Sequence, residues 1–303
     1  MRLIRFTRAG GHPRRGLLLA GGEVLDLEAA SVPVPADPRD AWLLGSPTLL
    51  GARELLEQLS ADRERLAALR KSGVVLDPEE ARLLAPVPRP GKLICIGLNY
   101  RDHAEESGMP IPERPLVFSK WPSCLIGPDD AIELPHNSDQ VDYEAELAFV
   151  IGKRARFVPK EAAYRYVLGY ACFHDVSARD FQFADVQWQR GKSCETFAPM
   201  GPFVATTDEI PDPQNLAIKL RLQGETLQDS HTSQLIFSIP ELVQAMSEHY
   251  TLEPGDVIAT GTPPGVGFAR KPPVFLQAGQ QVEVEIQGLG VLANPVIAAA
   301  VPA

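Results

Sequence analysis

One stretch of the sequence decides how the chain folds: Val141-Asp142-Tyr143-Glu144-Ala145-Glu146-Leu147-Ala148-Phe149-Val150-Ile151. Apolar and acidic residues alternate in its first half, and this period of two predicts a β-strand with two different faces. Asp142, Glu144 and Glu146 then share one face. A solvated acidic face would account for this segment taken alone, because charged strand faces usually lie in water. In a partly buried cleft, the same carboxylates would repel one another several times more strongly and would need a cation.

A further carboxylate follows an apolar run downstream. Tyr170-Ala171-Cys172-Phe173-His174 predicts a strand, and Asp175 stands directly after it. Asp175 could cap the helix-like segment that begins near Val176, which is a common use of aspartate. Alternatively, it joins Glu144 and Glu146 around one metal ion. Three oxygen ligands without a His or Cys cluster favour a hard ion, Mg²⁺ first and Mn²⁺ or Ca²⁺ next.

The composition is that of a globular protein with a sizeable core. The chain has 303 residues, of which 45% are hydrophobic and 22% charged, and this length suits one large domain or two smaller ones. The net charge of −10 argues against nucleic acid as a partner, because a phosphate-binding face is basic. No apolar segment is long enough to cross a membrane, and the charged N-terminus does not resemble a signal peptide. Four widely spaced cysteines without a C-x-x-C pair indicate reduced thiols, so we expect a cytoplasmic protein without a membrane partner.

The chain is expected to divide into a small N-terminal α+β domain with its linker, residues 1–90, and a catalytic domain, residues 91–303. Residues 17–27 predict a β-hairpin around Gly21-Gly22. Leucines at helical spacing between about residues 47 and 72 predict one or two amphipathic helices. The stretch Ala85-Pro86-Val87-Pro88-Arg89-Pro90-Gly91 cannot continue a helix or a central strand, so the boundary is placed there.

Short apolar runs separated by Pro and Gly turns fill the second part and predict a mainly β domain with a few helices. The runs are Leu93–Ile96, Leu116–Phe118, Leu147–Ile151, Val257–Ala259 and Val282–Ile286. A helix is predicted over Ile239–His249, with Pro240 at its start. Regular βαβ alternation is absent, which argues against a doubly wound sheet. Glu283 and Glu285 alternate with apolar residues, so their strand is predicted to be an edge strand with an acidic outer side.

Two further candidates have both an ordinary and a functional interpretation. His103 and Glu106 are three residues apart, so one helical turn would bring them within hydrogen-bonding reach. They could form a polar surface turn, or a pair in which the carboxylate raises the basicity of the imidazole. Lys192 could be solvated, or it could stabilise a developing enolate. Residues 108–112 predict a hinged lid that carries the histidine in when substrate binds.

Six motifs occur in order along the second part of the chain. They read Gly97-Leu98-Asn99-Tyr100-Arg101-Asp102-His103, Phe118-Ser119-Lys120, Asp142-Tyr143-Glu144-Ala145-Glu146-Leu147, His174-Asp175-Val176-Ser177-Ala178-Arg179-Asp180, Gly191-Lys192 and Thr260-Gly261-Thr262-Pro263-Pro264-Gly265-Val266-Gly267. With these motifs the sequence resembles the fumarylacetoacetate hydrolase family. The resemblance is strongest to the branch of domain-containing proteins, which includes acylpyruvases, oxaloacetate decarboxylases or tautomerases, and 2-hydroxyhepta-2,4-diene-1,7-dioate isomerases.

The resemblance implies a mixed β-roll or sandwich catalytic domain with a smaller N-terminal domain, assembled as a homodimer. It implies a metal site formed by Glu144, Glu146 and Asp175. The catalytic residues it implies are His103, Glu106 and Lys192, and the residues in motifs that line the substrate pocket are Lys120, Arg179, Gln182 and Thr262. The name-giving hydrolases carry an additional acidic metal ligand upstream. The neighbourhood of Asn99-Tyr100 shows no counterpart, which argues against fumarylacetoacetate itself as the substrate.

The leading hypothesis is Mg²⁺-dependent hydrolysis of a C–C bond in an acylpyruvate-type 2,4-dioxo acid. The metal would polarise the 2-oxo group, His103 with Glu106 would activate a water, and a pyruvate enolate would be held by the metal and Lys192. The same site could serve as an oxaloacetate decarboxylase or tautomerase, or as a 2-hydroxyhepta-2,4-diene-1,7-dioate isomerase, because these reactions share the enolate. A non-catalytic metabolite-binding protein on this scaffold is the alternative of another class.

Overall fold

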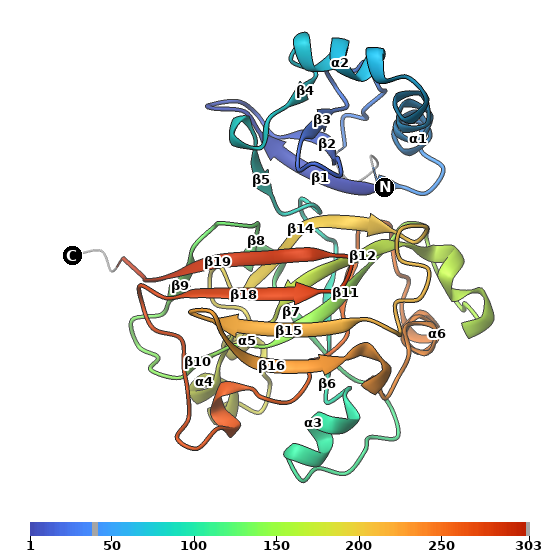
Figure 1. Cartoon of the computed structure of the whole chain (residues 1–303). Helices are drawn as coiled ribbons and strands as arrows, with labels where there is room; N and C mark the ends of the chain where they lie inside the picture. Colours follow the sequence, from blue (N-terminus) through green and yellow to red (C-terminus); the bar gives the residue numbers. More distant parts are fainter. Residues whose placement is uncertain (38–41, 301–303) are drawn as a thin grey trace.

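The structure is a computed structural model that describes residues 1–37 and 42–300. Figure 1 shows a small N-terminal unit, in blue and teal, above a larger body built mainly of strands. The described residues contain no helix long and apolar enough to cross a membrane.

The N-terminal unit is an antiparallel ladder of strands with two helices beside it. Its strands are β1 (Arg2–Thr7), β2 (Arg14–Leu18), β3 (Val24–Asp26), β4 (Val75–Leu76) and β5 (Arg82–Leu84). β2 and β3 pair antiparallel, which confirms the predicted hairpin. The leucine-rich segment forms two helices, α1 (Pro47–Ala61) and α2 (Arg63–Lys71). They separate at Asp62, because its carboxylate accepts a hydrogen bond from the Arg65 N–H and caps the start of α2.

The largest sheet has 12 strands and runs through both parts of the chain. Its order is β4-β3-β2-β1-β14-β12-β11-β17-β6-β7, with β5 on β1 and β8 on β14. The strands of the larger body are β6 (Leu93–Gly97), β7 (Leu116–Lys120), β8 (Leu125–Ile126), β11 (Ala145–Ile151), β12 (Val167–His174), β14 (Ala198–Thr206) and β17 (Val257–Ala259). Leu3 of β1 pairs with Val204 of β14. This pairing joins a strand from before the proline-rich stretch to a strand from after it. The division of the chain into two domains between residues 90 and 91 therefore stays a prediction.

A second sheet of five strands covers one face of the first. Its order is β16 (Glu225–His231), β15 (Ala217–Leu222), β18 (Gln281–Ile286), β19 (Gly290–Ala298) and β9 (Ile132–Leu134). Leu147 and Phe149 of β11 pack in one core cluster with residues of this sheet such as Val284. Ala148 and Val150 lie on the opposite face, in the core cluster that also contains residues of the N-terminal unit. The period of two predicted for this strand is therefore correct, and it puts Glu146 on the side of Ala148.

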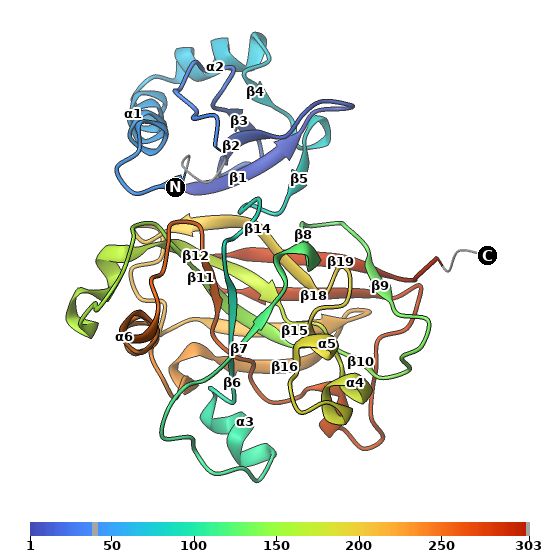
Figure 2. The same ribbon diagram turned by 180° about the vertical axis from the view of Figure 1, so that it is seen from behind.

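The remaining elements surround the ends of these strands. They are the paired strands β10 (Val141–Asp142) and β13 (Ser177–Ala178) and the helices α3 (Arg101–Glu106), α4 (Arg179–Ala184), α5 (Gln189–Lys192) and α6 (Ile239–His249). α6 has the predicted bounds, and Ser238 with Glu241 forms a capping box at its start. Figure 2 shows α4 and α5 on the side of the body seen from behind, with α3 below β6. The predicted mainly β fold with helices is confirmed.

Three predictions about the strands are wrong. The stretch 141–151 is not one strand, because Tyr143 and Glu144 lie between β10 and β11. Backbone groups there find other partners: Glu144 C=O accepts from the Asp175 N–H, and the Ala145 N–H donates to a side chain of β16. Asp142, Glu144 and Glu146 are all buried, which excludes the alternative of a solvated acidic face. β18 lies inside its sheet between β15 and β19, so Glu283 is not on an edge strand; it pairs with Arg221 of β15.

Candidate metal centre

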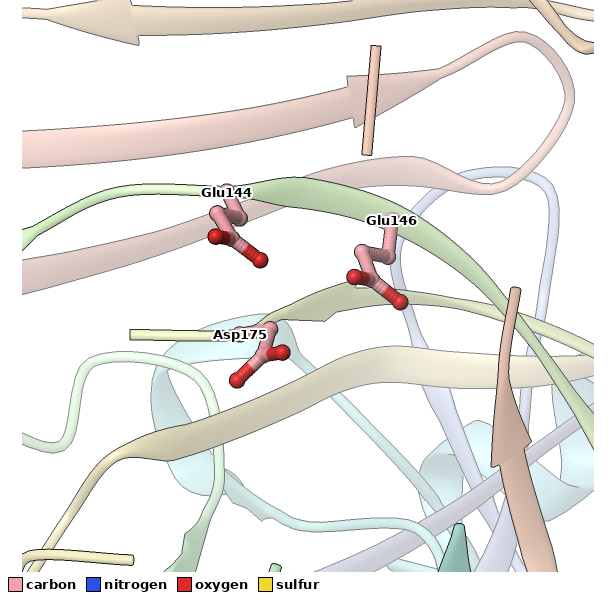
Figure 3. Close-up of side chains that lie close together, drawn as sticks. All are labelled: Glu144, Glu146 and Asp175. Carbon is pink, nitrogen blue, oxygen red and sulfur yellow. The ribbon is translucent and has the colours of Figure 1, made fainter. Parts of the chain in front are cut away.

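Three carboxylates from neighbouring strands meet at one point. Glu144 immediately precedes β11, Glu146 lies on β11, and Asp175 follows the end of β12. The two strands pair antiparallel, which brings the start of β11 beside the end of β12. One oxygen of each carboxylate lies within 4.8 Å of the others, and all three residues are buried. Figure 3 shows Glu144 and Glu146 extending from one segment on the side where Asp175 lies.

Two buried lysines neutralise part of this cluster. Lys192 Nζ, on α5, lies 2.8 Å from Glu144 Oε2 and 2.7 Å from Asp175 Oδ2. Lys120 Nζ, at the end of β7, donates to Asp175 Oδ1 at 2.6 Å and to the Val176 carbonyl at 3.0 Å. The interpretation of Lys192 as a solvated lysine is therefore wrong, since only 2% of its surface is exposed.

Arg179 connects a fourth carboxylate to the same group. Its Nε donates to Asp142 Oδ2 at 2.8 Å, and its Nη2 lies 2.6 Å from Glu144 Oε1. Gln182 Oε1 accepts from Nη1 at 2.8 Å, and the guanidinium lies over the Phe268 ring. These contacts fix the plane of the guanidinium, so that Arg179 holds the Glu144 carboxylate in one orientation.

The loop at residues 261–267 is tied to two of the acidic side chains. The Gly261 N–H donates to Glu146 Oε2 at 2.9 Å, and the Gly267 N–H donates to Asp142 Oδ1 at 2.7 Å. Gly261 has a φ of 98°, and an added Cβ would lie 2.9 Å from Asn99 Cβ. Only glycine therefore lets the backbone approach Glu146 in this conformation.

The charges of this group do not balance. Asp142, Glu144, Glu146 and Asp175 face three cations, Lys120, Arg179 and Lys192, which leaves one excess negative charge when all are ionised. The uncompensated negative charge belongs to one residue. Within the described part of the chain, Glu146 has no ion pair and accepts a hydrogen bond from the Gly261 N–H alone.

Burial and charge shift the pKa values of these groups in opposite directions. Burial alone would raise the pKa of Glu144, but Lys192 and Arg179 outweigh it and hold that pKa well below its usual range. For Glu146, burial and the charges of Asp175 and Glu144 raise the pKa well above the usual value. Burial disfavours the charged form of Lys192, yet Asp175 and Glu144 raise its pKa. The metal-free cluster thus favours a proton on Glu146.

These features fit a hard divalent cation. All three candidate ligands are carboxylates, the donors that Mg²⁺, Mn²⁺ and Ca²⁺ prefer. Glu146 is buried without a cationic partner, so a bound cation would remove its unfavourable charge environment. Lys192 contacts Glu144 and Asp175 at once, so its ammonium takes a position between two of the predicted ligands.

His103 and Glu106 lie on α3 and contact each other. His103 Nδ1 is 3.1 Å from Glu106 Oε2, and the Gly265 N–H donates to both Glu106 oxygens at 3.0 and 3.2 Å. The loop 261–267 therefore bonds Glu146 near one end and Glu106 near the other. In residues 1–37 and 42–300, no hydrogen bond or ion pair links the histidine pair directly to the three carboxylates. Residues 105–111 are exposed, and their role as a lid stays a prediction.

Sequence patterns do not predict Gln228 as a residue of the site and give Asp142 no individual role. Thr262 Oγ1 accepts from Gln228 Nε2 at 2.9 Å, and Gln228 also accepts from the Ala145 N–H at 2.8 Å. Gln228 thus joins β16 to β11 beside Glu144. Its position in a strand gives no local signal for this contact. Asp142 belongs to the predicted acidic face, but its bonds to Arg179 and to the loop 261–267 form only in the folded chain.

Comparisons with known proteins give consistent results. The family described as "Fumarylacetoacetate (FAA) hydrolase C-terminal" matches residues 92–297. A Xenopus laevis protein named "Oxaloacetate tautomerase fahd2, mitochondrial" is 44% identical over 301 residues, which cover 98% of this chain and 90% of the relative.

Two solved structures share both the fold and the sequence pattern. The structure of 5-carboxymethyl-2-hydroxymuconate delta-isomerase from Mycobacterium smegmatis has a TM-score of 0.77 and 32% identity, covering 99% of this chain and 100% of that one. The fumarylacetoacetate hydrolase of Exiguobacterium antarcticum has a TM-score of 0.80 and 35% identity, with the same coverage of both chains. The motifs, the fold and these matches agree, and the chain belongs to the fumarylacetoacetate hydrolase family.

Proposed function

We propose that this protein is a metal-dependent enzyme that interconverts the keto and enol forms of a small 2-oxo diacid such as oxaloacetate. The observation that carries the proposal is the buried carboxylate cluster, in a chain 44% identical to a protein named as an oxaloacetate tautomerase. The relative named as a delta-isomerase of a 2-hydroxymuconate supports the same class of chemistry. Adding a divalent ion to the one excess negative charge would leave the site cationic, which suits an anionic substrate.

The buried side chains have different roles in this proposal. Glu144, Glu146 and Asp175 would hold the ion, Mg²⁺ or another hard divalent cation, which would polarise the 2-oxo group. Once Glu144 and Asp175 serve as ligands, Lys192 loses part of its bonding to them. Its ammonium then donates hydrogen bonds to the substrate oxygens that gain negative charge. Lys120 stays bonded to Asp175 and keeps that carboxylate in place.

In this proposal His103 moves the proton. Its Nδ1 faces Glu106, which leaves Nε2 for the substrate. Neutral Nε2 takes the proton from the carbon beside the carbonyl group, and the electron pair of the broken C–H bond forms the enolate. The imidazolium then delivers the same proton to the carbonyl oxygen, and the reverse path regenerates the keto form. Glu106 stabilises the imidazolium in between.

The test follows oxaloacetate tautomerisation by the absorbance of the enol, with protein freed of metal by EDTA and with Mg²⁺ restored. We expect Mg²⁺-dependent turnover, its loss in Glu144→Ala, and a fall in kcat of at least about 100-fold in His103→Ala. Glu283→Ala is the matched control, because this strand glutamate pairs with Arg221 away from the cluster. Undiminished Mg²⁺-dependent turnover in Glu144→Ala would contradict the proposal.

Hydrolysis of an acylpyruvate C–C bond is the second candidate. The hydrogen-bonded pair of His103 and Glu106 favours it, since the same imidazole could activate a water molecule. Assays with acylpyruvates that measure pyruvate release, beside assays of oxaloacetate for pyruvate and CO₂, separate hydrolysis, decarboxylation and tautomerisation. Absence of turnover of all these substrates by metal-loaded protein would favour a metabolite-binding protein.

Three further expectations remain predictions. The homodimer can be measured by light scattering on the purified protein. The four cysteines are unpaired, as expected for a reducing compartment, whereas the Xenopus laevis relative is named as mitochondrial. The cytoplasmic location therefore needs its own measurement in cells. Residues 91–303 are proposed as the catalytic domain, and their expression without residues 1–90 tests that division.

A further inference from the structure

A cavity lies where the N-terminal unit meets the larger body, away from the carboxylate cluster. Its volume is about 660 Å³. Three segments that are distant in sequence line it: β1 through Arg5, the end of β5 with the proline-rich stretch (residues 84–90), and residues 122–130. None of the residues that line it belongs to the proposed metal site or to the His103–Glu106 pair.

Arg5 is a half-buried cation in this cavity, and no acidic partner lies among the described residues. Its Nη1 donates to the Ala85 carbonyl at 2.9 Å. Among the described residues, no carboxylate forms an ion pair with it. Burial and the charge of Arg15 lower the pKa of Arg5 to about 10, and no acidic group offsets them. A desolvated guanidinium in this setting is stabilised by any anion that enters.

The neighbouring arginines of the N-terminal unit do have partners. Arg14 Nε lies 2.8 Å from Asp26 Oδ2, and Arg15 Nη1 lies 3.6 Å from Glu28 Oε1. Arg8 also pairs with Asp26, at 3.3 Å. The unpaired state of Arg5 is thus a local feature of the cavity.

The other charged residues of the cavity add to its positive potential. Arg89 is exposed and also lines the cavity. Among the described residues that line the cavity, Asp130 is the acidic one; it is already paired with Arg82 and accepts a hydrogen bond from the Gly127 N–H at 2.8 Å. Two guanidinium groups therefore face this space, and the carboxylate of Asp130 is already neutralised by Arg82.

The shape of the cavity limits what can fill it. Its volume lies within the range of small-molecule sites. Leu84, Pro88 and Ile126 supply apolar lining beside the arginines. A molecule with a short carbon skeleton and oxyanion groups matches this mixture, since guanidinium binds carboxylate and phosphoryl oxygens with paired hydrogen bonds.

We propose that this cavity is a binding site for a small organic anion that carries at least two negative charges on carboxylate or phosphoryl groups, held by Arg5 and Arg89. The bound anion bridges β1, the proline-rich stretch and residues 122–130. It therefore stiffens the junction between the N-terminal unit and the body that carries the metal-site residues.

The experiment measures binding to metal-free, full-length protein by isothermal titration calorimetry. The probes are tricarballylate, glycerol 3-phosphate and inorganic phosphate, with sodium chloride at equal ionic strength as the reference. We expect one site for tricarballylate or glycerol 3-phosphate with a Kd of about 1 mM or below, and weaker binding of inorganic phosphate, which lacks a carbon skeleton. Which of the two organic probes binds more tightly distinguishes a carboxylate ligand from a phosphate ligand.

Variants locate the binding. Arg89→Gln and Ser123→Asp alter lining residues that are both exposed, so folding should be preserved, and each should weaken binding at least about tenfold. Arg5→Gln should abolish binding, but it also removes the bond to Ala85, so its fold is checked by circular dichroism. Arg114→Gln, an exposed arginine outside the cavity, is the matched control and should bind as the wild type does.

A second readout does not depend on the calorimetric signal. Hydrogen exchange of residues 84–90 should slow when the organic anion is added to the wild type, and should not change in Ser123→Asp. Equal affinity of Ser123→Asp and wild type would overturn the proposal. So would the absence of binding of every probe at concentrations up to about 10 mM.

Discussion

Lys192 offers the sharpest test of the electrostatic argument, through the substitution Lys192→Met. Methionine keeps much of the length and volume of lysine but carries no charge. The ammonium lies 2.8 Å from Glu144 Oε2 and 2.7 Å from Asp175 Oδ2, and the side chain is buried. Its removal makes the cluster more negative by one charge, from one excess negative charge to two when every group is ionised.

The magnitude follows from these contacts. At an effective dielectric constant of about 20, each contact at this distance corresponds to about 6 kcal/mol of Coulomb attraction. The cost of burying the ammonium offsets most of that, and breaking a buried ion pair by removing one partner costs about 3–5 kcal/mol. We therefore expect the free energy of unfolding of Lys192→Met, measured in EDTA, to fall by about 3–5 kcal/mol.

Divalent metal should reverse much of this loss. Without the ammonium, Glu144 Oε2 and Asp175 Oδ2 no longer contact Lys192 and can act as metal ligands, while Arg179 and Lys120 still hold the other two oxygens. The variant should therefore bind Mg²⁺ more tightly than the wild type does. A free metal concentration 100 times the Kd stabilises a protein by about 2.7 kcal/mol. The gain in stability on adding a fixed Mg²⁺ concentration should therefore be larger for the variant.

Urea unfolding followed by circular dichroism, with EDTA and with Mg²⁺, measures both quantities. Lys71→Met is the control, because Lys71 is exposed at the end of α2, and its effect should stay within about 0.5 kcal/mol. If Lys192→Met were as stable as the wild type in EDTA, or if Mg²⁺ stabilised both proteins equally, Lys192 would not compensate the charges of Glu144 and Asp175. Turnover of oxaloacetate should also fall, since the variant lacks the proposed hydrogen-bond donor.

Three further predictions concern the same cluster. In EDTA at pH 8, Glu146→Gln should be more stable than the wild type by about 1.4 kcal/mol for each unit by which the pKa of Glu146 is raised. The folded wild type holds the proton on Glu146 more tightly than the unfolded chain does, so the stability of the wild type falls as pH rises above 4.5. In urea unfolding, the stability advantage of Glu146→Gln should therefore vanish as pH falls to 4.5. An advantage that does not depend on pH would contradict the raised pKa of Glu146. Gly261→Ala should lower the free energy of unfolding by at least about 1 kcal/mol, because alanine is strained at this φ. Its Mg²⁺ affinity in calorimetry should also fall, because the N–H that holds Glu146 moves. An unchanged affinity would show that this N–H does not position Glu146 for the metal. Asp142→Ala should cost about 3–5 kcal/mol in thermal or urea unfolding, since it leaves the buried Arg179 without one of its two carboxylates, and a loss below about 1 kcal/mol would show that the pair contributes little.

Local periodicity in the sequence is enough to predict several parts of the site. The alternation of apolar and acidic residues predicts Glu144 and Glu146 on one side, and an apolar run that ends at Asp175 predicts a third carboxylate at a strand end. The i,i+3 spacing of His103 and Glu106 was enough to predict their contact, because a helical turn is a local structure. The family motifs supplied the order of these parts and therefore the overall fold.

The compensation of the charges at the site depends on contacts that form when the chain folds. Nothing near Lys192 in the sequence indicates that its ammonium is buried between Glu144 and Asp175, 48 and 17 positions away. Local patterns do not predict strand order either. For this reason they do not show that β18 lies inside its sheet or that the strand is interrupted at Tyr143 and Glu144. Such features depend on contacts between distant segments, and their free energies are set by burial and by the partners that the fold supplies.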